Sequence, residues 1–102
     1  TLKFGQLFID LEKYEVINNG RRVSLTYKEF QLLVLLASSP GRVYSREVLL
    51  SQVWGYEYLG GTRTVDVHVR RLRSKIEDPD HPFIETIWNV GYRFNTEVSD
   101  LN

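Results

Sequence analysis

The 102-residue sequence contains no cysteine, which excludes disulfide bonds and thiol chemistry. Its two histidines, His68 and His81, lie far apart without cysteine partners, so no metal site is expected. No run approaches the 18 apolar residues of a membrane span. The N-terminus lacks a basic segment followed by an apolar one, so we expect no signal peptide. Together these absences predict a cytoplasmic protein with no membrane partner.

Catalytic patterns are missing as well. We find no nucleophile–base pair, no glycine-rich phosphate loop and no metal set, so we expect neither an enzyme nor a cofactor. The length suits one domain over residues 1–102. An apolar content of 42% and an aromatic content of 13% are enough for a packed core, so disorder is not expected.

The net charge is zero, but the charges are unevenly distributed. Residues 62–75 hold five basic side chains and one acidic one, whereas residues 76–102 hold one and six. A local surplus, not the total, decides whether a surface attracts a polyanion. An isolated charge run is more often a solvated helix face. Here the basic residues are mostly arginine and lie opposite an apolar stripe, which favours binding.

Residues 62–75 are the most informative stretch, because as a helix they have two different faces. The apolar face consists of Val65, Val69, Leu72 and Ile76. The opposite face carries Val67, Arg70, Arg71 and Ser74, with Arg73 at its flank. Guanidinium groups match phosphate oxygens and the major-groove edge of guanine. We expect this helix to be anchored along one side and to meet DNA along the other.

Local signals predict, in order, a small sheet at about 2–25, helices at about 27–38, 46–54 and 63–78, and a β-hairpin at about 83–96. Asn19-Gly20 is a two-residue hairpin turn. Thr26 and Glu29 form a capping box, and Pro79 ends the third helix. The predicted class is α+β. Three helices followed by a hairpin are typical of a winged helix, a variant of helix-turn-helix.

Five spaced segments resemble, in order, the C-terminal DNA-binding domains of OmpR/PhoB-type response regulators: 25–33, 43–50, 53–55, 63–73 and 91–94. The resemblance extends over about residues 2–96. It implies a four-stranded N-terminal sheet, three helices, a C-terminal wing, and tandem dimers on direct repeats in promoter DNA. The family normally carries an N-terminal receiver domain that a sensor kinase phosphorylates, as part of a two-component phosphorelay. This sequence begins at the first strand of such an output domain, so we expect either an excised output domain or a stand-alone regulator.

Base readout is predicted for Arg71, which points away from the apolar stripe and matches a family position in the major groove. Val67 and Ser74 share its side of the helix, where a valine suits a thymine methyl group. The alternative for Arg71 is an arginine that faces solvent. The alternative for Val67 and Ser74 is a crowded surface position without a bonded partner.

Phosphate contacts are predicted at Trp54, Arg63, Thr64, His68, Arg70, Arg73, Thr86 and Tyr92. For Trp54, Thr86 and Tyr92 the resemblance implies this role, and core packing is the alternative for Trp54. His68 either contacts the backbone of DNA or packs partly buried. Asp66 stands one turn before Arg70 and two turns before Arg73, so it is expected to orient both, unless it joins a plain surface ion-pair network.

The wing tip departs from the family pattern at Trp88, beside Asn89, because many relatives have an arginine in the minor groove there. A tryptophan lacks the charge that a narrow minor groove attracts, so Trp88 is expected to lie on a sugar edge or to pack the wing. The loop residues Tyr56, Glu57, Tyr58 and Leu59 occupy the place where the family contacts RNA polymerase; the alternative is that they fold back on the core.

Two function classes remain in competition. The first is sequence-specific DNA binding for transcription regulation. The second is a winged-helix protein-interaction module, in which the basic helix meets an acidic protein surface. A gel shift separates them, because such a module would not distinguish promoter DNA from scrambled DNA.

Overall fold

A computed structural model describes residues 1–96, so the predicted domain end at 97–102 lies outside the described residues. The chain forms, in order, β1 (Leu2–Phe4), β2 (Leu7–Asp10), β3 (Glu15–Asn18), β4 (Arg21–Val23), α1 (Tyr27–Ala37), β5 (Tyr44–Ser45), α2 (Arg46–Trp54), α3 (Arg63–Ile76), β6 (Ile84–Ile87) and β7 (Gly91–Phe94). Strands β1 to β4 make one antiparallel sheet, and a second sheet has the order β5-β7-β6. The predicted α+β class is confirmed.

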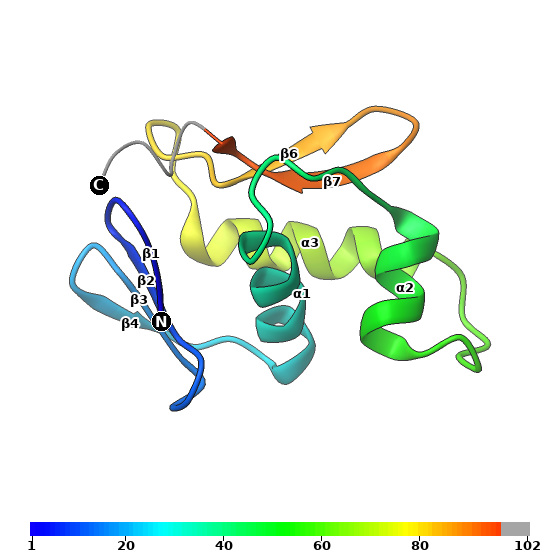
Figure 1. The fold of residues 1–102 in the computed structure, drawn as a ribbon, viewed down its shortest axis with the longest axis horizontal. Helices are drawn as coiled ribbons and strands as arrows, with labels where there is room; N and C mark the ends of the chain where they lie inside the picture. Colours follow the sequence, from blue (N-terminus) through cyan, green and yellow to red (C-terminus); the bar gives the residue numbers. More distant parts are fainter. Residues whose placement is uncertain (97–102) are drawn as a thin grey trace.

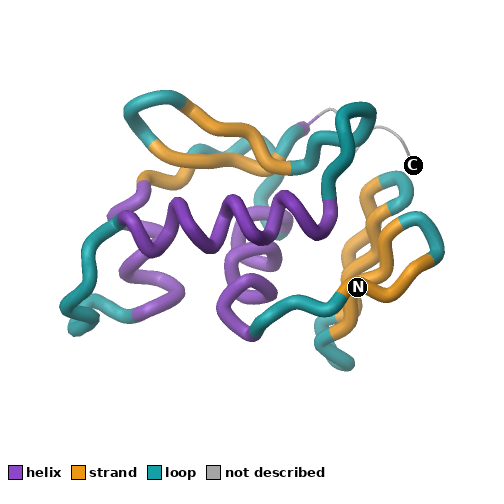
Figure 2. Tube along the Cα trace, turned by 180° about the vertical axis from the view of Figure 1, so that it is seen from behind, coloured by secondary structure: helices purple, strands orange, loops and turns teal. Residues whose placement is uncertain are grey.

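The two sheets and helices α1 and α2 lie around α3 and leave one of its sides uncovered. In Figure 1 the N-terminal sheet lies at one end of the long axis, and the loop after α2 lies at the other. Helices α1 and α2 stand on one side of α3, and the wing, meaning β6, β7 and the turn between them, covers another side. Figure 2 views the molecule from behind, where α3 runs across the front of α1 and α2.

The N-terminal sheet contains the Asn-Gly hairpin that the sequence predicts. Asn19 and Gly20 connect β3 to β4 with φ angles of 53° and 80°, the left-handed backbone that a tight hairpin needs. Side chains alternate along the strands, so that Leu7, Ile9 and Val16 point inward and are almost fully buried. The predicted sheet and its Asn-Gly turn are confirmed.

The first two helices begin at polar caps. The Glu29 N–H donates to Thr26 Oγ1 at 3.2 Å, and the Thr26 N–H donates to Glu29 Oε1 at 2.9 Å, which completes the predicted capping box. Ser45 caps α2 by accepting from the Val48 N–H at 3.1 Å. Gly55 ends α2 with a φ of 88°, a backbone conformation that residues with a side chain rarely adopt.

The buried face of α3 is the one that its spacing predicts: Val65, Val69, Leu72 and Ile76. The helix ends at Ile76, so the predicted end near residue 78 is wrong. Glu77 turns extended, and its carboxylate accepts the backbone N–H groups of Phe83 (2.8 Å) and Ile84 (2.6 Å). These hydrogen bonds tie Glu77 to the start of the wing and hold it in the extended conformation, so the helix does not continue past Ile76.

Strand β5 was not predicted, because two residues give no periodic signal. Tyr44 pairs with Tyr92, and Ser45 pairs with Gly91. At Gly91 the two backbones come so close that a Cβ atom would lie 1.9 Å from the Tyr44 carbonyl oxygen. The segment just before α2 is therefore part of the wing's sheet, and it ties α2 to β7.

Candidate nucleic-acid interface

The outward face of α3 consists of Arg63, Val67, Arg70, Arg71 and Ser74. All of these are exposed except Val67, which is half-buried. Within residues 1–96, neither Arg70 nor Arg71 forms an ion pair, and no helix or strand lies over this side of α3 in Figure 2. Ser74 donates its hydroxyl proton to the Arg71 carbonyl oxygen at 2.7 Å. The arginines are thus available to an external anion.

Asp66 does not orient the arginines assigned to it, so that prediction is wrong. Its Oδ1 atom accepts from Arg46 Nε at 2.8 Å and from the Tyr92 hydroxyl at 2.6 Å. Helical spacing places Asp66 one turn before Arg70 and two turns before Arg73, but the Asp66 carboxylate faces the wing and the start of α2. Partners from other elements therefore reach the carboxylate first.

The charges around Asp66 favour its ionised form. Burial raises the pKa of the Asp66 carboxyl, but the hydrogen bonds from Tyr92 and Arg46, with the charges of Arg46 and Arg63, outweigh it and hold the pKa below its ordinary value. The pKa of Tyr92 is raised by burial and by its bond to Asp66. The pair is therefore a carboxylate and a neutral phenol at neutral pH.

Arg73 leaves the outward face and joins the wing. Its Nη2 atom donates to Thr86 Oγ1 at 2.7 Å, its Nη1 atom to the Ile84 carbonyl at 3.3 Å, and its guanidinium stacks over the Tyr92 ring at 5.3 Å. We call Arg46, Asp66, Arg73, Thr86 and Tyr92 the helix–wing cluster. Phosphate contacts by Arg73, Thr86 and Tyr92 stay predictions. The single Tyr92 hydroxyl proton is already donated to Asp66, so a donated bond to phosphate would have to replace that one.

His68 and Trp54 pack together where α2 meets α3. Their rings meet edge to face at 5.0 Å, and His68 Nδ1 lies 2.8 Å from the Thr64 carbonyl oxygen. A carbonyl only accepts, so Nδ1 carries a proton, and donation from Nε2 to a phosphate would require the doubly protonated ring. His68 is half-buried and packs on Trp54, and its phosphate contact stays a prediction. Both interpretations of Trp54 fit its half-buried ring, and its phosphate contact stays a prediction.

The wing tip and the loop after α2 both present large side chains to solvent. Trp88 is 81% exposed, so the expectation that it packs the wing is wrong; Asn89 beside it has a φ of 67°. In the loop, Tyr56 is 89% and Leu59 101% exposed, so these two do not fold back on the core. Tyr58 does so in part, with its ring 6.3 Å from that of Trp54, and Glu57 is exposed.

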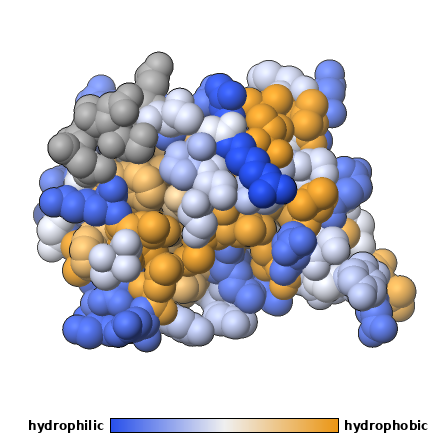
Figure 3. Space-filling model, viewed as in Figure 1, coloured by the Kyte–Doolittle hydropathy of each residue, from blue (hydrophilic) through white to orange (hydrophobic). Residues whose placement is uncertain are grey.

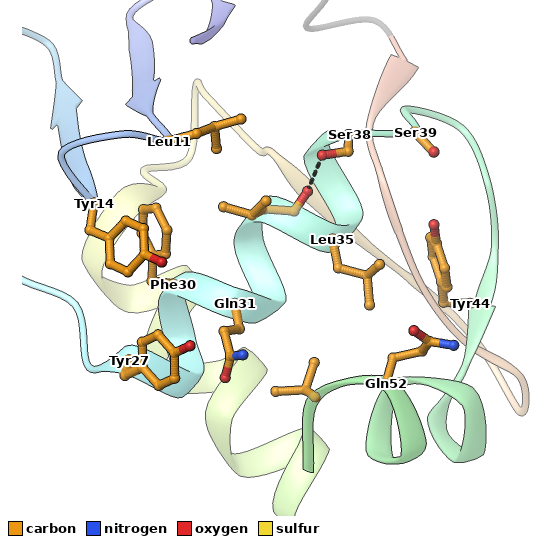
Figure 4. A pocket seen from close by; sticks show the side chains of 12 residues that line it. Leu11, Tyr14, Tyr27, Phe30, Gln31, Leu35, Ser38, Ser39, Tyr44 and Gln52 are labelled. Atoms are coloured by element: carbon orange, nitrogen blue, oxygen red, sulfur yellow. Dashed lines mark hydrogen bonds between the residues drawn. The ribbon is translucent and has the colours of Figure 1, made fainter. Parts of the chain in front are cut away.

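The opposite face of the molecule has a different character. Apolar side chains gather there over α1, as Figure 3 shows. They surround a cleft of about 460 Å³, in which Tyr14, Tyr27 and Phe30 cluster at one end (Figure 4). None of the twelve residues that line this cleft is charged, so it does not suit a phosphate. The basic surface and the apolar surface are thus separate.

Polar contacts that the sequence analysis missed hold the C-terminal end of α3 in place. Lys75 Nζ donates to Glu29 Oε1 at 2.6 Å, and Asn18 Nδ2 donates to the Ile76 carbonyl at 2.7 Å. Arg46 was also missed. The only hint of a special role in the sequence was its position: Arg46 is a basic residue in the first turn of α2, where the helix dipole favours acidic residues.

Other kinds of site find no support in the described part of the chain. Residues 1–96 contain no group of three or more metal-ligating side chains. In the same range, every helix is too short or too polar to cross a bilayer.

Three helices, a hairpin wing and an uncovered basic face on α3 define a winged-helix domain of the DNA-binding class. The family described as "Transcriptional regulatory protein, C terminal" matches residues 20–94. The chain therefore belongs to the family of C-terminal DNA-binding domains of OmpR/PhoB-type response regulators. The resemblance in the sequence and the predicted winged-helix fold are confirmed.

Particular relatives agree with this assignment. The chain is 51% identical over 90 residues to the uncharacterized transcriptional regulatory protein YclJ of Bacillus subtilis, covering 87% of this chain and 40% of YclJ. The structure of the response regulator DrrB of Thermotoga maritima, an OmpR/PhoB homolog, has a TM-score of 0.83 at 43% identity, covering 91% of this chain and 43% of DrrB. The chain thus spans less than half the length of these two proteins.

A third relative was solved with DNA. The DNA-binding domain of RstA from Klebsiella pneumoniae, in complex with the RstA box, has a TM-score of 0.82 at 37% identity, covering 93% of this chain and 96% of that domain.

Proposed function

We propose that the domain binds double-stranded promoter DNA at specific sequences, with α3 in the major groove and the wing on the adjacent backbone or minor groove. The observation that carries this proposal is the outward face of α3. Within residues 1–96, Arg70 and Arg71 of this face form no ion pair, while the other face is fully buried and fixes the position of the helix. The RstA complex supports the proposal, because a related domain with the same fold was solved on its own DNA box.

The residues divide into base readers and backbone contacts. Arg71, near the middle of α3, reads a base through its bidentate fork, and Val67 and Ser74 flank it. Arg63, Thr64 and Arg70 hold phosphates, as does the indole N–H of Trp54, and His68 beside it is a further phosphate contact. At the wing, Trp88 and Asn89 lie against the sugar–phosphate backbone. If about five phosphates are contacted, log K against log salt should have a slope of roughly −4.5 per protomer.

The wider assembly follows from the family. Phosphorylation of a receiver domain in the complete regulator would bring two output domains together as a tandem homodimer. They would occupy direct repeats about one helical turn apart, in the cytoplasm where promoter DNA lies. The exposed loop residues Tyr56, Glu57, Tyr58 and Leu59 are then free to contact RNA polymerase.

Selection of bound duplexes from a random pool tests the proposal directly, followed by titration of a selected and a scrambled duplex. Arg71→Ala should remove about 1–3 kcal/mol of base discrimination while weakening scrambled DNA much less. Arg21→Ala is the matched control, since it removes the same charge from an exposed position on the N-terminal sheet. Equal losses on both duplexes would exclude base reading by Arg71. A domain that binds both duplexes equally would instead be an interaction module for acidic surfaces.

A further inference from the structure

Positive charge is in surplus where α2, α3 and the wing meet. Arg46 and Arg73 both lie over the Tyr92 ring, at 5.9 Å and 5.3 Å, and the charge of Arg63 also acts on Asp66. In the described range, Asp66 is the only carboxylate that pairs with any of the three arginines. The charge of Arg73 also acts on the Glu77 carboxylate, so two negative charges face three positive ones, and the junction still attracts an anion.

Arg46 is held in a way that leaves most of its donors unused. Of the five N–H donors of this planar fork, Asp66 accepts only the one on Nε, at 2.8 Å, and the Tyr92 hydroxyl is the other hydrogen-bonding neighbour of Arg46. At least three of the four donors on the two Nη atoms therefore stay available. The Arg46 side chain keeps 27% of its surface exposed. Because Asp66 holds Nε and the guanidinium lies over the Tyr92 ring, the edge that carries the two Nη atoms (the Nη edge) points in a defined direction.

A bond from Tyr92 fixes the carboxylate in turn. The Tyr92 hydroxyl donates to the same Oδ1 atom at 2.6 Å, and Tyr92 belongs to β7. The carboxylate therefore joins the start of α2, the first turns of α3 and the wing at one atom. These are the elements between which a DNA strand would pass if α3 occupied the major groove.

We propose that Arg46 is a further phosphate contact of this domain and that Asp66 is its positioning residue. The inference rests on the proposed DNA binding. Asp66 does not touch DNA; it directs the free edge of Arg46 and holds Tyr92 in register. A phosphate seated on the Nη edge would receive two parallel charge-assisted hydrogen bonds, the bidentate geometry that arginine provides and lysine does not.

The sign of one substitution separates this idea from simple electrostatics. Asp66→Asn removes a negative charge beside a polyanion, so charge alone predicts tighter binding to any DNA. The positioning role predicts weaker binding, by about two- to tenfold, because an amide oxygen holds the guanidinium less firmly than a carboxylate does and the arginine must be ordered further when DNA binds. The loss should be similar on the selected and scrambled duplexes, since phosphates carry no sequence information.

The experiment is a titration of both duplexes by fluorescence anisotropy at several salt concentrations. Arg46→Gln should reduce the magnitude of the salt slope by about 0.9, the contribution of one phosphate. Asp66→Asn placed in the Arg46→Gln background should cause no further weakening, because Asp66 acts through Arg46. Glu12→Gln is the charge control: it makes the same charge change at an exposed site in the turn between β2 and β3 and should leave both affinities within about twofold.

Several outcomes overturn the inference. An unchanged slope in Arg46→Gln removes the phosphate contact, and tighter binding by Asp66→Asn removes the positioning role. If Asp66→Asn does not fold, Arg46→Lys replaces it, because lysine keeps the charge but has no Nε–H for Asp66. Lysine should retain the slope and lose affinity, and full native affinity would contradict positioning. A native domain that binds neither duplex refutes the proposed function and this inference with it. A native domain that binds, with variants that do not differ from it, refutes this inference alone.

Discussion

Replacing Glu29 by alanine is expected to destabilise the domain far more than replacing any exposed acid. Glu29 lies in the first turn of α1, yet only 1% of its surface is exposed, and its Oε1 atom accepts from both the Thr26 N–H and Lys75 Nζ. Lys75 stands in the last turn of α3. A single carboxylate oxygen therefore caps one helix and anchors the end of another.

The size of the loss can be worked out from these contacts. Losing the capping box costs about 1 kcal/mol, since water can reach the exposed Thr26. The pair with Lys75 contributes up to about 1 kcal/mol, because the Lys75 side chain is 36% exposed and partly screened. The buried methylene adds about 0.8 kcal/mol. Together these losses come to about 3 kcal/mol, a fall in Tm of roughly 10–25 °C for a domain of this size.

Urea unfolding followed by tryptophan fluorescence measures this loss. Glu47→Ala is the matched control, because Glu47 is an exposed acid in the first turn of α2, and it should cost less than about 1 kcal/mol. A double-mutant cycle with Lys75→Ala should give a coupling energy of about 0.5–1 kcal/mol. Equal losses for the Glu29 and Glu47 variants would refute the reasoning.

The same contribution should depend on pH. Burial raises the pKa of Glu29, but the hydrogen bonds from Lys75 and the Thr26 N–H outweigh it, so the folded pKa lies below its ordinary value. The stabilisation is therefore complete above about pH 4.3, the ordinary glutamate pKa, and is lost as the pH falls through the lowered folded pKa. The difference between native and Glu29→Ala should shrink in that acidic range and nowhere above it.

Two further predictions concern the wing and the loop. Gly91→Ala should destabilise the domain by about 2 kcal/mol or more, because the new Cβ would meet the Tyr44 carbonyl oxygen at 1.9 Å. Thermal unfolding measures this loss of stability. Gly61→Ala is the control, because Gly61 has open space around it, and it should change stability by less than about 0.5 kcal/mol. Leu59→Ser should leave stability and DNA affinity unchanged, since Leu59 is 101% exposed, yet lower transcription from a target promoter in an assay with RNA polymerase. Undiminished transcription would count against the loop as a polymerase contact.

Elements with a strong local signal were predictable from the sequence. The buried stripe of α3 repeats every three to four residues, so its position followed from spacing alone. The Asn19-Gly20 turn and the Thr26–Glu29 box followed in the same way, because each motif satisfies its own backbone hydrogen bonds. Such features need no knowledge of what the rest of the chain does.

Contacts between distant elements were not predictable. Helical spacing offered Arg70 and Arg73 as partners for Asp66, but the structure supplies Arg46 from α2 and Tyr92 from β7. Spacing along one helix shows which residues of that helix lie near each other. It does not show which side chains from other elements pack against the same face. β5 was missed for a related reason, since two residues become a strand only because β7 lies beside them.

The pairing of β5 with β7 also bears on how the chain is synthesised. β7 is the central strand of its sheet and the last strand described, so neither β5 nor β6 has a partner until residues 91–94 have left the ribosome. Up to that moment the nascent chain contains the N-terminal sheet and the helices, and the side of α3 that the wing later covers is exposed. Resistance to a protease should consequently arise in a single late step rather than grow as the chain lengthens.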